Sequence, residues 1–279
     1  MMKNIELVID TATDLPEDII REYHIRKVEL NVAFGGVDYT GISNKEFYEM
    51  MRTSLELPKT SASSPERYME QYKYDADIVM LTLTRKLSSS YSNANLAKEM
   101  YLADHSHKEI EVVDTTNGCI GSGLLAIMVG EMIKAGNSFA EVVKNIYDLR
   151  DRIIHYGLLE TLDNAVKGGR VSKAKGMIAN ALNLKPIVEI SDGLVKPYDK
   201  ARGTKNGLKK LTDIIVNNIK SKGQKYSLLG IAHANAYDKA ILIRDEILSR
   251  SNFDRVIISE IGPLMGTYTA EGAVMVAAL

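Results

Sequence analysis

The chain has 279 residues, 45% of them hydrophobic and 25% charged, with a formal net charge of -1. That length is enough for a large core and for two domains, and the near-neutral charge argues against nucleic acid as a partner, because nucleic-acid-binding surfaces are usually basic. A single cysteine, Cys119, excludes an intramolecular disulfide and a multi-cysteine metal site, and the apolar runs are too short to span a membrane. We therefore expect a soluble cytoplasmic protein without a metal.

Short apolar runs rich in β-branched residues predict strands, and longer segments between them have apolar residues at helical spacing. This alternation is typical of an α/β protein with a largely parallel sheet. In chain order, the sequence predicts a strand at 5–9, a helix at 16–23, a helix around Phe47, a strand at 78–83, a helix at 94–101, a strand at 110–113, helices at 124–133 and 140–149, strands at 153–159 and 185–190, a helix at 208–219, a strand at 228–232, a helix at 240–248 and a strand at 256–260.

A change of pattern near residue 150 predicts two domains. Beyond it, a strand is followed by a basic segment interrupted by glycines and then by a long helix. We place an N-terminal α/β domain at 1–152, with a largely parallel sheet flanked by helices, and a smaller C-terminal α/β domain at 153–279.

Polar residues at the predicted element ends have local interpretations. Asp10 and Asp14 follow the first strand, where α/β sheets bind ligands, but their spacing does not match an Asp-rich phosphotransferase loop. Asp14 is interpreted as the N-cap of the next helix, and Asp10 as a residue that orients a neighbouring hydroxyl. Ser43 or Asn44 is expected to cap the helix around Phe47.

Other candidate motifs favour structural roles. The sequence has no Walker A loop, G-x-S-x-G, H-E-x-x-H or G-x-G-x-x-G motif. The glycines of NGCIGSGLL (117–125) can offer N–H groups to an anion, but we favour a tight turn with close helix packing. The histidines are interpreted as solvated or structural: His24, His105, His107, His155 and His233.

Two clusters of hydroxyl side chains are harder to explain as turn and cap residues alone. PKTSASSPERY (58–68) resembles neither helix nor strand and contains Thr60, Ser61, Ser63 and Ser64, and TLTRKLSSSYSNA (82–94) follows a strand and precedes a helix. A carboxylate tolerates burial only if several donors satisfy it. Hydroxyls and N–H groups near a helix N-terminus supply such donors without adding a fixed charge.

Two basic stretches contain glycine: VKGGRVSKAKG (166–176) and DKARGTKNG (199–207). Charge runs are usually solvated loops. Arginine beside glycine also recurs in phosphate and carboxylate sites, because its planar fork pairs bidentately while glycine lets the backbone approach. The candidates are Arg170, Lys173, Lys175, Arg202 and Lys205.

At these residues the chain resembles the DegV family over essentially its whole length. The segments that resemble family motifs, in order, are LVIDTATDLP, KTSASSPERY, KLSSSYSNA, EVVDTTNGCIGSGLL, VKGGRVSKAKG, LNLKPIVEISDGLVKPYDKARG and IGPLMGTYTAEGA. The resemblance implies two α/β domains with a ligand tunnel between or within them. It implies a long-chain fatty acid as the ligand, whose carboxylate would be held by Thr60, Ser61, Ser88 and Ser89 with help from Tyr268.

The resemblance further implies the acyl-carrying subunit of a fatty acid kinase rather than an enzyme. A separate kinase subunit would supply the nucleotide site, so no cofactor is expected, and Arg170 and Arg202 would face that partner or the incoming phosphate. Neither nucleic acid nor a membrane span is expected, although transient membrane contact is compatible with a lipid ligand.

One motif departs from the family pattern. Tyr268, in GTYTAEGA, stands where the family usually has a histidine, and tyrosine offers a hydrogen bond without a positive charge. Two other functions stay open, of which only the first depends on this departure. One is a regulatory protein that binds another lipid or small acid, and the other is a small-molecule phosphotransferase that uses Asp10 and the NGCIGSG turn.

Overall fold

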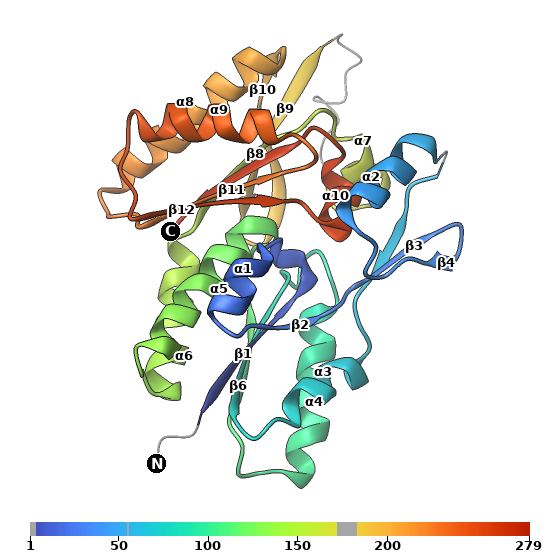
Figure 1. Ribbon diagram of the computed structural model, residues 1–279, viewed down its shortest axis with the longest axis vertical. Helices are drawn as coiled ribbons and strands as arrows, with labels where there is room; N and C mark the ends of the chain where they lie inside the picture. Colours follow the sequence, from blue (N-terminus) through green and yellow to red (C-terminus); the bar gives the residue numbers. More distant parts are fainter. Residues whose placement is uncertain (1–3, 55, 172–182) are drawn as a thin grey trace.

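A computed structural model describes residues 4–54, 56–171 and 183–279. Its first sheet is entirely parallel, in the order β2-β1-β6-β7. The sheet lies between helices on both faces (Figure 1). Its strands are β1 (Ile5–Asp10), β2 (Arg26–Val28), β6 (Asp77–Thr82) and β7 (Ile110–Asp114).

Both faces of this sheet are apolar and buried, because residues that alternate along each strand point to opposite faces. Val8, Ile78 and Met80 pack against α3 (Pro65–Tyr72) and α4 (Ser90–Asp104). Leu7, Ile9 and Leu81 point the other way and join a larger cluster. That cluster also involves α1 (Glu17–Glu22), α5 (Cys119–Lys134) and α6 (Phe139–Arg152).

The second sheet is mixed, in the order β10-β9-β8-β13-β11-β12. Only β11 and β12 run parallel, and the other pairs are antiparallel. Its strands are β8 (Ile154–Leu158), β9 (Leu184–Ser191), β10 (Leu194–Arg202), β11 (Leu228–His233), β12 (Arg255–Glu260) and β13 (Val274–Ala278). The chain is therefore α/β with a largely parallel first sheet, as predicted, whereas its second sheet is largely antiparallel.

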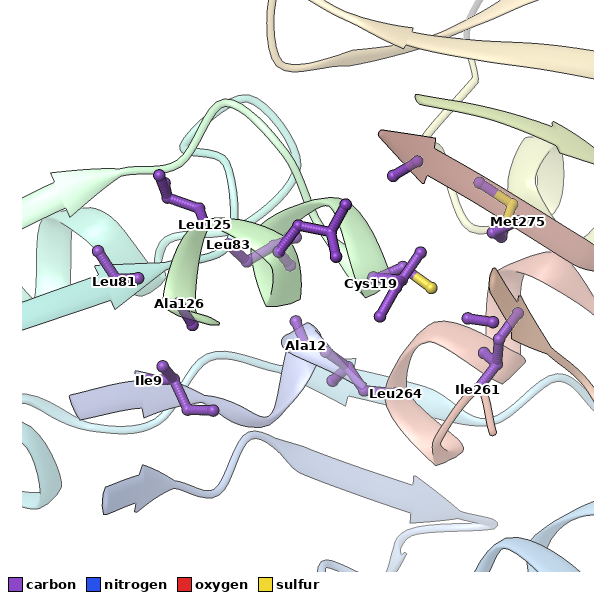
Figure 2. Close-up of a cluster of buried hydrophobic side chains, with 14 of the residues drawn as sticks. Ile9, Ala12, Leu81, Leu83, Cys119, Leu125, Ala126, Ile261, Leu264 and Met275 are labelled. Carbon is purple, nitrogen blue, oxygen red and sulfur yellow. The ribbon is translucent and has the colours of Figure 1, made fainter. Parts of the chain in front are cut away.

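Helix α5 joins the two sheets. Apolar residues around its whole circumference are buried, as expected of a helix between two layers. Figure 2 shows its side chains between Ile9 and Leu81 of the first sheet and Met275 of the second. The outer face of the second sheet is covered by α8 (Thr204–Lys222) and α9 (Tyr237–Leu248).

A third, small antiparallel sheet flanks the contact between the two larger ones (Figure 1). It contains β3 (Asn31–Phe34), β4 (Val37–Asp38) and β5 (Lys59–Ser61). Against it lies α10 (Pro263–Thr269), which also packs against α2 (Asn44–Thr53) and α7 (Asp163–Lys167). Residues 58–68, which resembled neither helix nor strand, thus contain β5 and the start of α3.

The predicted caps have different outcomes. The Ser43 hydroxyl accepts from the Glu46 N–H, which confirms Ser43 as the N-cap of α2. The prediction for Asp14 was wrong, because Pro16 precedes α1 while Asp14 ends a short 3-10 turn, η1 (Thr11–Thr13). Asp14 has a left-handed backbone (φ 49°) and its buried carboxylate accepts from the Gly262 N–H at 2.8 Å.

The strands of the first large sheet all precede residue 152 and those of the second all follow it. The division into domains at 1–152 and 153–279 stays a prediction. No helix in the described part of the chain is both long and apolar enough to cross a bilayer.

Candidate functional site

A cavity of about 590 Å³ lies where the small sheet, α5, α10 and the inner face of the second sheet meet. Its volume falls in the range of about 300–1,000 Å³ typical of ligand pockets. Apolar side chains form most of its walls: Leu30, Leu83, Leu159, Val188, Ile190, Val195, Leu264, Met265 and Met275. The cavity therefore offers an apolar ligand a largely desolvated environment.

Hydroxyl groups from separate segments line the same cavity. Thr60 lies in β5, whose pairing with β3 fixes its position, and Tyr268 lies in α10. The Thr60 Oγ1 and Tyr268 OH atoms are 2.5 Å apart and share a hydrogen bond. Two hydroxyls more than 200 residues apart in sequence thus meet at one point of the wall.

The second hydroxyl cluster surrounds the N-terminus of α4. The turn that precedes the helix is held by the Leu87 and Ser88 N–H groups, which both donate to the Thr84 carbonyl. The Ser88 hydroxyl accepts from the Ser90 N–H and lies 2.8 Å from the Ser90 hydroxyl. Ser88, Ser89 and Ser92 line the cavity. The positive end of the helix dipole lies at the same place, which favours a negative charge there.

Ser61 also lines the cavity, but its hydroxyl already accepts a hydrogen bond from the Asn31 side chain at 3.0 Å. The structure therefore brings Thr60, Ser61, Ser88, Ser89 and Tyr268 to one cavity, as the sequence predicted. Their roles toward a ligand stay predictions.

Arg170 lines the cavity and contacts Tyr268 directly. Its guanidinium carbon is 4.8 Å from the centre of the Tyr268 ring, a cation–π arrangement, and its Nη1 donates to the Gly168 carbonyl at 2.6 Å. Gly168 makes this packing feasible, because an added Cβ would lie 2.4 Å from Tyr268 Cε1. The sequence did not indicate that a formal positive charge lies beside the hydroxyl pair.

Arg202 is exposed at the end of β10 and is not among the residues that line the cavity. Lys173 and Lys175 lie outside the described residues. Among the candidates that the structure describes, which are Arg170, Arg202 and Lys205, only Arg170 lines the cavity.

Asp10 is a buried residue that holds the segment leading into the Ser88 turn. It is fully buried, and its carboxylate accepts from the Leu83 N–H at 2.7 Å and the Ala12 N–H at 3.2 Å. The Thr13 hydroxyl donates to the Asp10 backbone carbonyl at 3.3 Å, so Asp10 orients a neighbouring hydroxyl through its main chain while its carboxylate binds N–H groups. The Leu83 bond fixes the strand end that leads into the Ser88 turn. Burial raises the pKa of Asp10 to about 7, against the effect of both N–H donors.

In the NGCIGSGLL segment, Asn117 and Gly118 precede α5, and the residues from Cys119 onward form the first turns of this helix. Gly123 lies so close to η1 that an added Cβ would be 2.9 Å from the Thr13 carbonyl oxygen. This confirms close helix packing as the role of that glycine. Cys119, the first residue of α5, is buried and contributes to the cavity wall.

Three of the histidines contact other residues of the protein in ways that fit a structural role. His105 stacks on Tyr101 at 4.2 Å between ring centroids, and His233 accepts from the Ala236 N–H. His155 is buried in β8, and its Nδ1 is 2.7 Å from Asn117 Oδ1. Within residues 4–54, 56–171 and 183–279, no group of three or more histidine, cysteine or acidic residues is arranged to bind a metal.

Comparison with known proteins gives consistent matches along the chain. The family model described as "Uncharacterised protein, DegV family" matches residues 4–279. A DegV domain-containing protein of Caldanaerobacter subterraneus subsp. tengcongensis is 30% identical over 280 residues, which cover 98% of this chain and 97% of that protein.

Two solved structures extend the likeness to three dimensions. The crystal structure of a DegV family protein from Ruminococcus gnavus, refined with vaccenic acid, has a TM-score of 0.90 and 29% identity, and the match covers 98% of this chain and 99% of the other. A DegV family protein from Thermus thermophilus, described by its fatty acid binding, has a TM-score of 0.87 and 25% identity over 99% of both chains. With its sequence matched from residue 4 to its last residue and its fold shared across both sheets, the chain belongs to the DegV family.

Proposed function

We propose that this protein binds a long-chain fatty acid in the cavity, with the carboxylate at Thr60, Ser88 and Tyr268. The observation that carries the proposal is one apolar cavity with hydroxyl groups from β5, the α4 N-terminus and α10 on its wall. The fatty acid ligands named for the Ruminococcus gnavus and Thermus thermophilus proteins support it.

The energetics favour a ligand with a long tail and a weakly held head. Burial contributes roughly 0.8 kcal/mol per methylene, so a tail of ordinary length supplies on the order of 10 kcal/mol before the cost of association. The bound carboxylate needs only enough hydrogen-bond donors to replace the hydrogen bonds that water gives it in solution. Thr60, Ser88, Tyr268 and the α4 N-terminus offer neutral donors, and Arg170 offers a charged one.

The position of Arg170 explains how a tyrosine can stand where the family usually has a histidine. Tyr268 contributes a hydroxyl, while the guanidinium over its ring contributes the positive charge. This division supports a carboxylate ligand over a neutral lipid, because only a charged head group would form a charge-assisted hydrogen bond with the guanidinium.

We further propose that the protein presents the bound carboxylate to a separate kinase subunit in the cytoplasm and has no nucleotide site of its own. The support is the family resemblance, which implies a protein that carries the acyl group for a fatty acid kinase. Arg202, exposed at the end of β10, is then free to face the partner.

Mass spectrometry of an organic extract of the purified protein tests ligand binding. We expect a long-chain acid at close to one per chain. Failure to find one, together with failure to take up added acid, would contradict the proposal. For the partner, we expect no ATP turnover by the isolated chain, and turnover would support the phosphotransferase alternative.

A further inference from the structure

The segment that connects α10 to β13 has a backbone conformation that its sequence disfavours. Ala270, the first residue after α10, has φ 61° and ψ 165°. Glycine adopts this region readily, whereas a residue with a Cβ does so only at a cost in energy. Such a conformation persists only where the surrounding contacts hold it. Ala270 follows Tyr268 by two residues, so the strained position lies directly beside the hydroxyl pair of the cavity.

Glu271 supplies contacts that hold this segment. Its carboxylate accepts from Arg52 Nε at 2.8 Å and Nη2 at 2.6 Å, and from Asn235 Nδ2 at 2.6 Å. Arg52 lies in the last turn of α2, which packs against α10 (Figure 1). The two bonds from one guanidinium fix the direction of the carboxylate as well as its distance. Because the Glu271 side chain is 31% exposed, we expect this ion pair to contribute little to global stability, which favours a local role.

The residues after Glu271 are anchored to the second sheet. The Gly272 N–H donates to the Ala234 carbonyl at 2.8 Å, and the Gly272 carbonyl accepts from Lys239 Nζ at 2.8 Å. The Ala234 N–H donates to the Ala273 carbonyl at 2.9 Å. The chain is thus fixed on this side of the strained residue. Relaxation of Ala270 would therefore move the element that precedes it, which is α10.

Helix α10 depends on its neighbours for its position. It has seven residues, and a helix this short is not stable by itself. Four of these residues line the cavity: Leu264, Met265, Tyr268 and Thr269. Tyr268 lies in the last turn, next to the strained segment, and its hydroxyl is 2.5 Å from Thr60 Oγ1. A shift of this turn would separate the two hydroxyls.

We propose that Glu271 is a positioning residue for fatty acid binding. Its carboxylate, held by Arg52 and Asn235, keeps Ala270 in the strained conformation and thereby keeps the Tyr268 hydroxyl at the head-group site. This inference rests on the proposed function of the cavity. It adds a residue that acts through Tyr268, since Glu271 itself lies outside the cavity lining.

The test measures the Kd of octadecanoic acid by displacement of a fluorescent fatty acid from delipidated protein. Glu271→Gln should raise the Kd about three- to tenfold, a part of the hydrogen bond that Tyr268 donates to a charged group. Arg52→Met removes the same ion pair from α2 and should have the same effect. Glu22→Gln is the matched control, because Glu22 forms a similar ion pair with two nitrogens of Arg255 outside the cavity lining. Thermal unfolding of each variant identifies any that fails to fold.

Two combined variants distinguish positioning from a general loss of stability. In a Tyr268→Phe background, Glu271→Gln should raise the Kd no further, because the hydroxyl that Glu271 positions is absent. In the Glu271→Gln background, Ala270→Gly should restore most of the lost affinity, because glycine adopts the observed conformation without strain.

The outcomes separate this inference from the proposed function. If wild-type protein binds no long-chain acid, the proposed function fails. If wild-type protein binds but folded Glu271→Gln has an unchanged Kd, or its effect adds to that of Tyr268→Phe, the inference is overturned while fatty acid binding stands. Failure of Ala270→Gly to restore affinity would overturn it as well.

Discussion

Removing two hydroxyls from the cavity wall tests the head-group site. We consider Thr60→Val combined with Ser88→Ala. Valine keeps the volume and β-branching that suit Thr60 in β5, and both changes delete a donor without adding charge.

The expected magnitude follows from the contacts. A hydrogen bond to a charged group contributes about 1.5–3 kcal/mol, so two lost donors give an upper limit of about 6 kcal/mol. Thr60 and Tyr268 share a hydrogen bond, and without Thr60 the tyrosine hydroxyl is free to turn to the carboxylate. This compensation favours a loss of about 3 kcal/mol, or roughly a hundredfold rise in Kd.

Displacement of a fluorescent fatty acid from purified, delipidated protein measures this change. Ser64→Ala is the matched control, since Ser64 belongs to the same hydroxyl-rich segment but is exposed and outside the lining. An unchanged Kd in the double variant, with an unfolding temperature close to wild type, would refute the assigned head-group site.

Three further predictions concern the surroundings of that site. Arg170→Met should raise the Kd for fatty acids at least about tenfold and leave the Kd of the corresponding alcohols unchanged, because only the acid carries a charge that pairs with the guanidinium. Isothermal titration measures both Kd values, and equal losses of affinity for acid and alcohol would exclude a charge effect. Gly168→Ala should weaken binding by displacing the Tyr268 ring, and a crystal structure with that ring unmoved would disprove the packing argument. For Asp10, the folded-state pKa of about 7 exceeds the ordinary value of 3.8, so the folded state holds more protons and the contribution of this carboxyl to stability falls as pH rises from about 4 to 7. Asp10→Asn should therefore flatten the decline in unfolding free energy over this window by up to about 4 kcal/mol in chemical denaturation, and an identical pH slope in both proteins would contradict it.

The sequence predicted the regular elements whose own pattern is strong. The buried strands of the first sheet and helices such as α8 were evident from apolar periodicity. β10 was missed because it carries Pro197 and several charges, features that an edge strand tolerates, and its pairing with β9 is irregular beside that proline. The short strands β2 to β5 have too few residues for a period to be recognised.

Contacts between residues far apart in the sequence determine the features that the sequence did not predict. Asp14 stands where a helix cap is usual, but its partner is the Gly262 N–H, 248 residues away. Likewise, the hydroxyl-rich segments were recognisable in the sequence, whereas the Arg170–Tyr268 stack depends on how α7 and α10 meet. Local composition can suggest a carboxylate site, but tertiary packing determines which charged side chain lies beside the hydroxyl groups.

A crystal structure of the protein loaded with a long-chain fatty acid tests the central claim most directly. We predict the carboxylate within hydrogen-bonding distance of Thr60 Oγ1 and near Ser88, with the chain running along the apolar wall formed by Val188, Ile190 and Met275. A carboxylate bound away from both hydroxyls, or a chain lying outside this cavity, would contradict it.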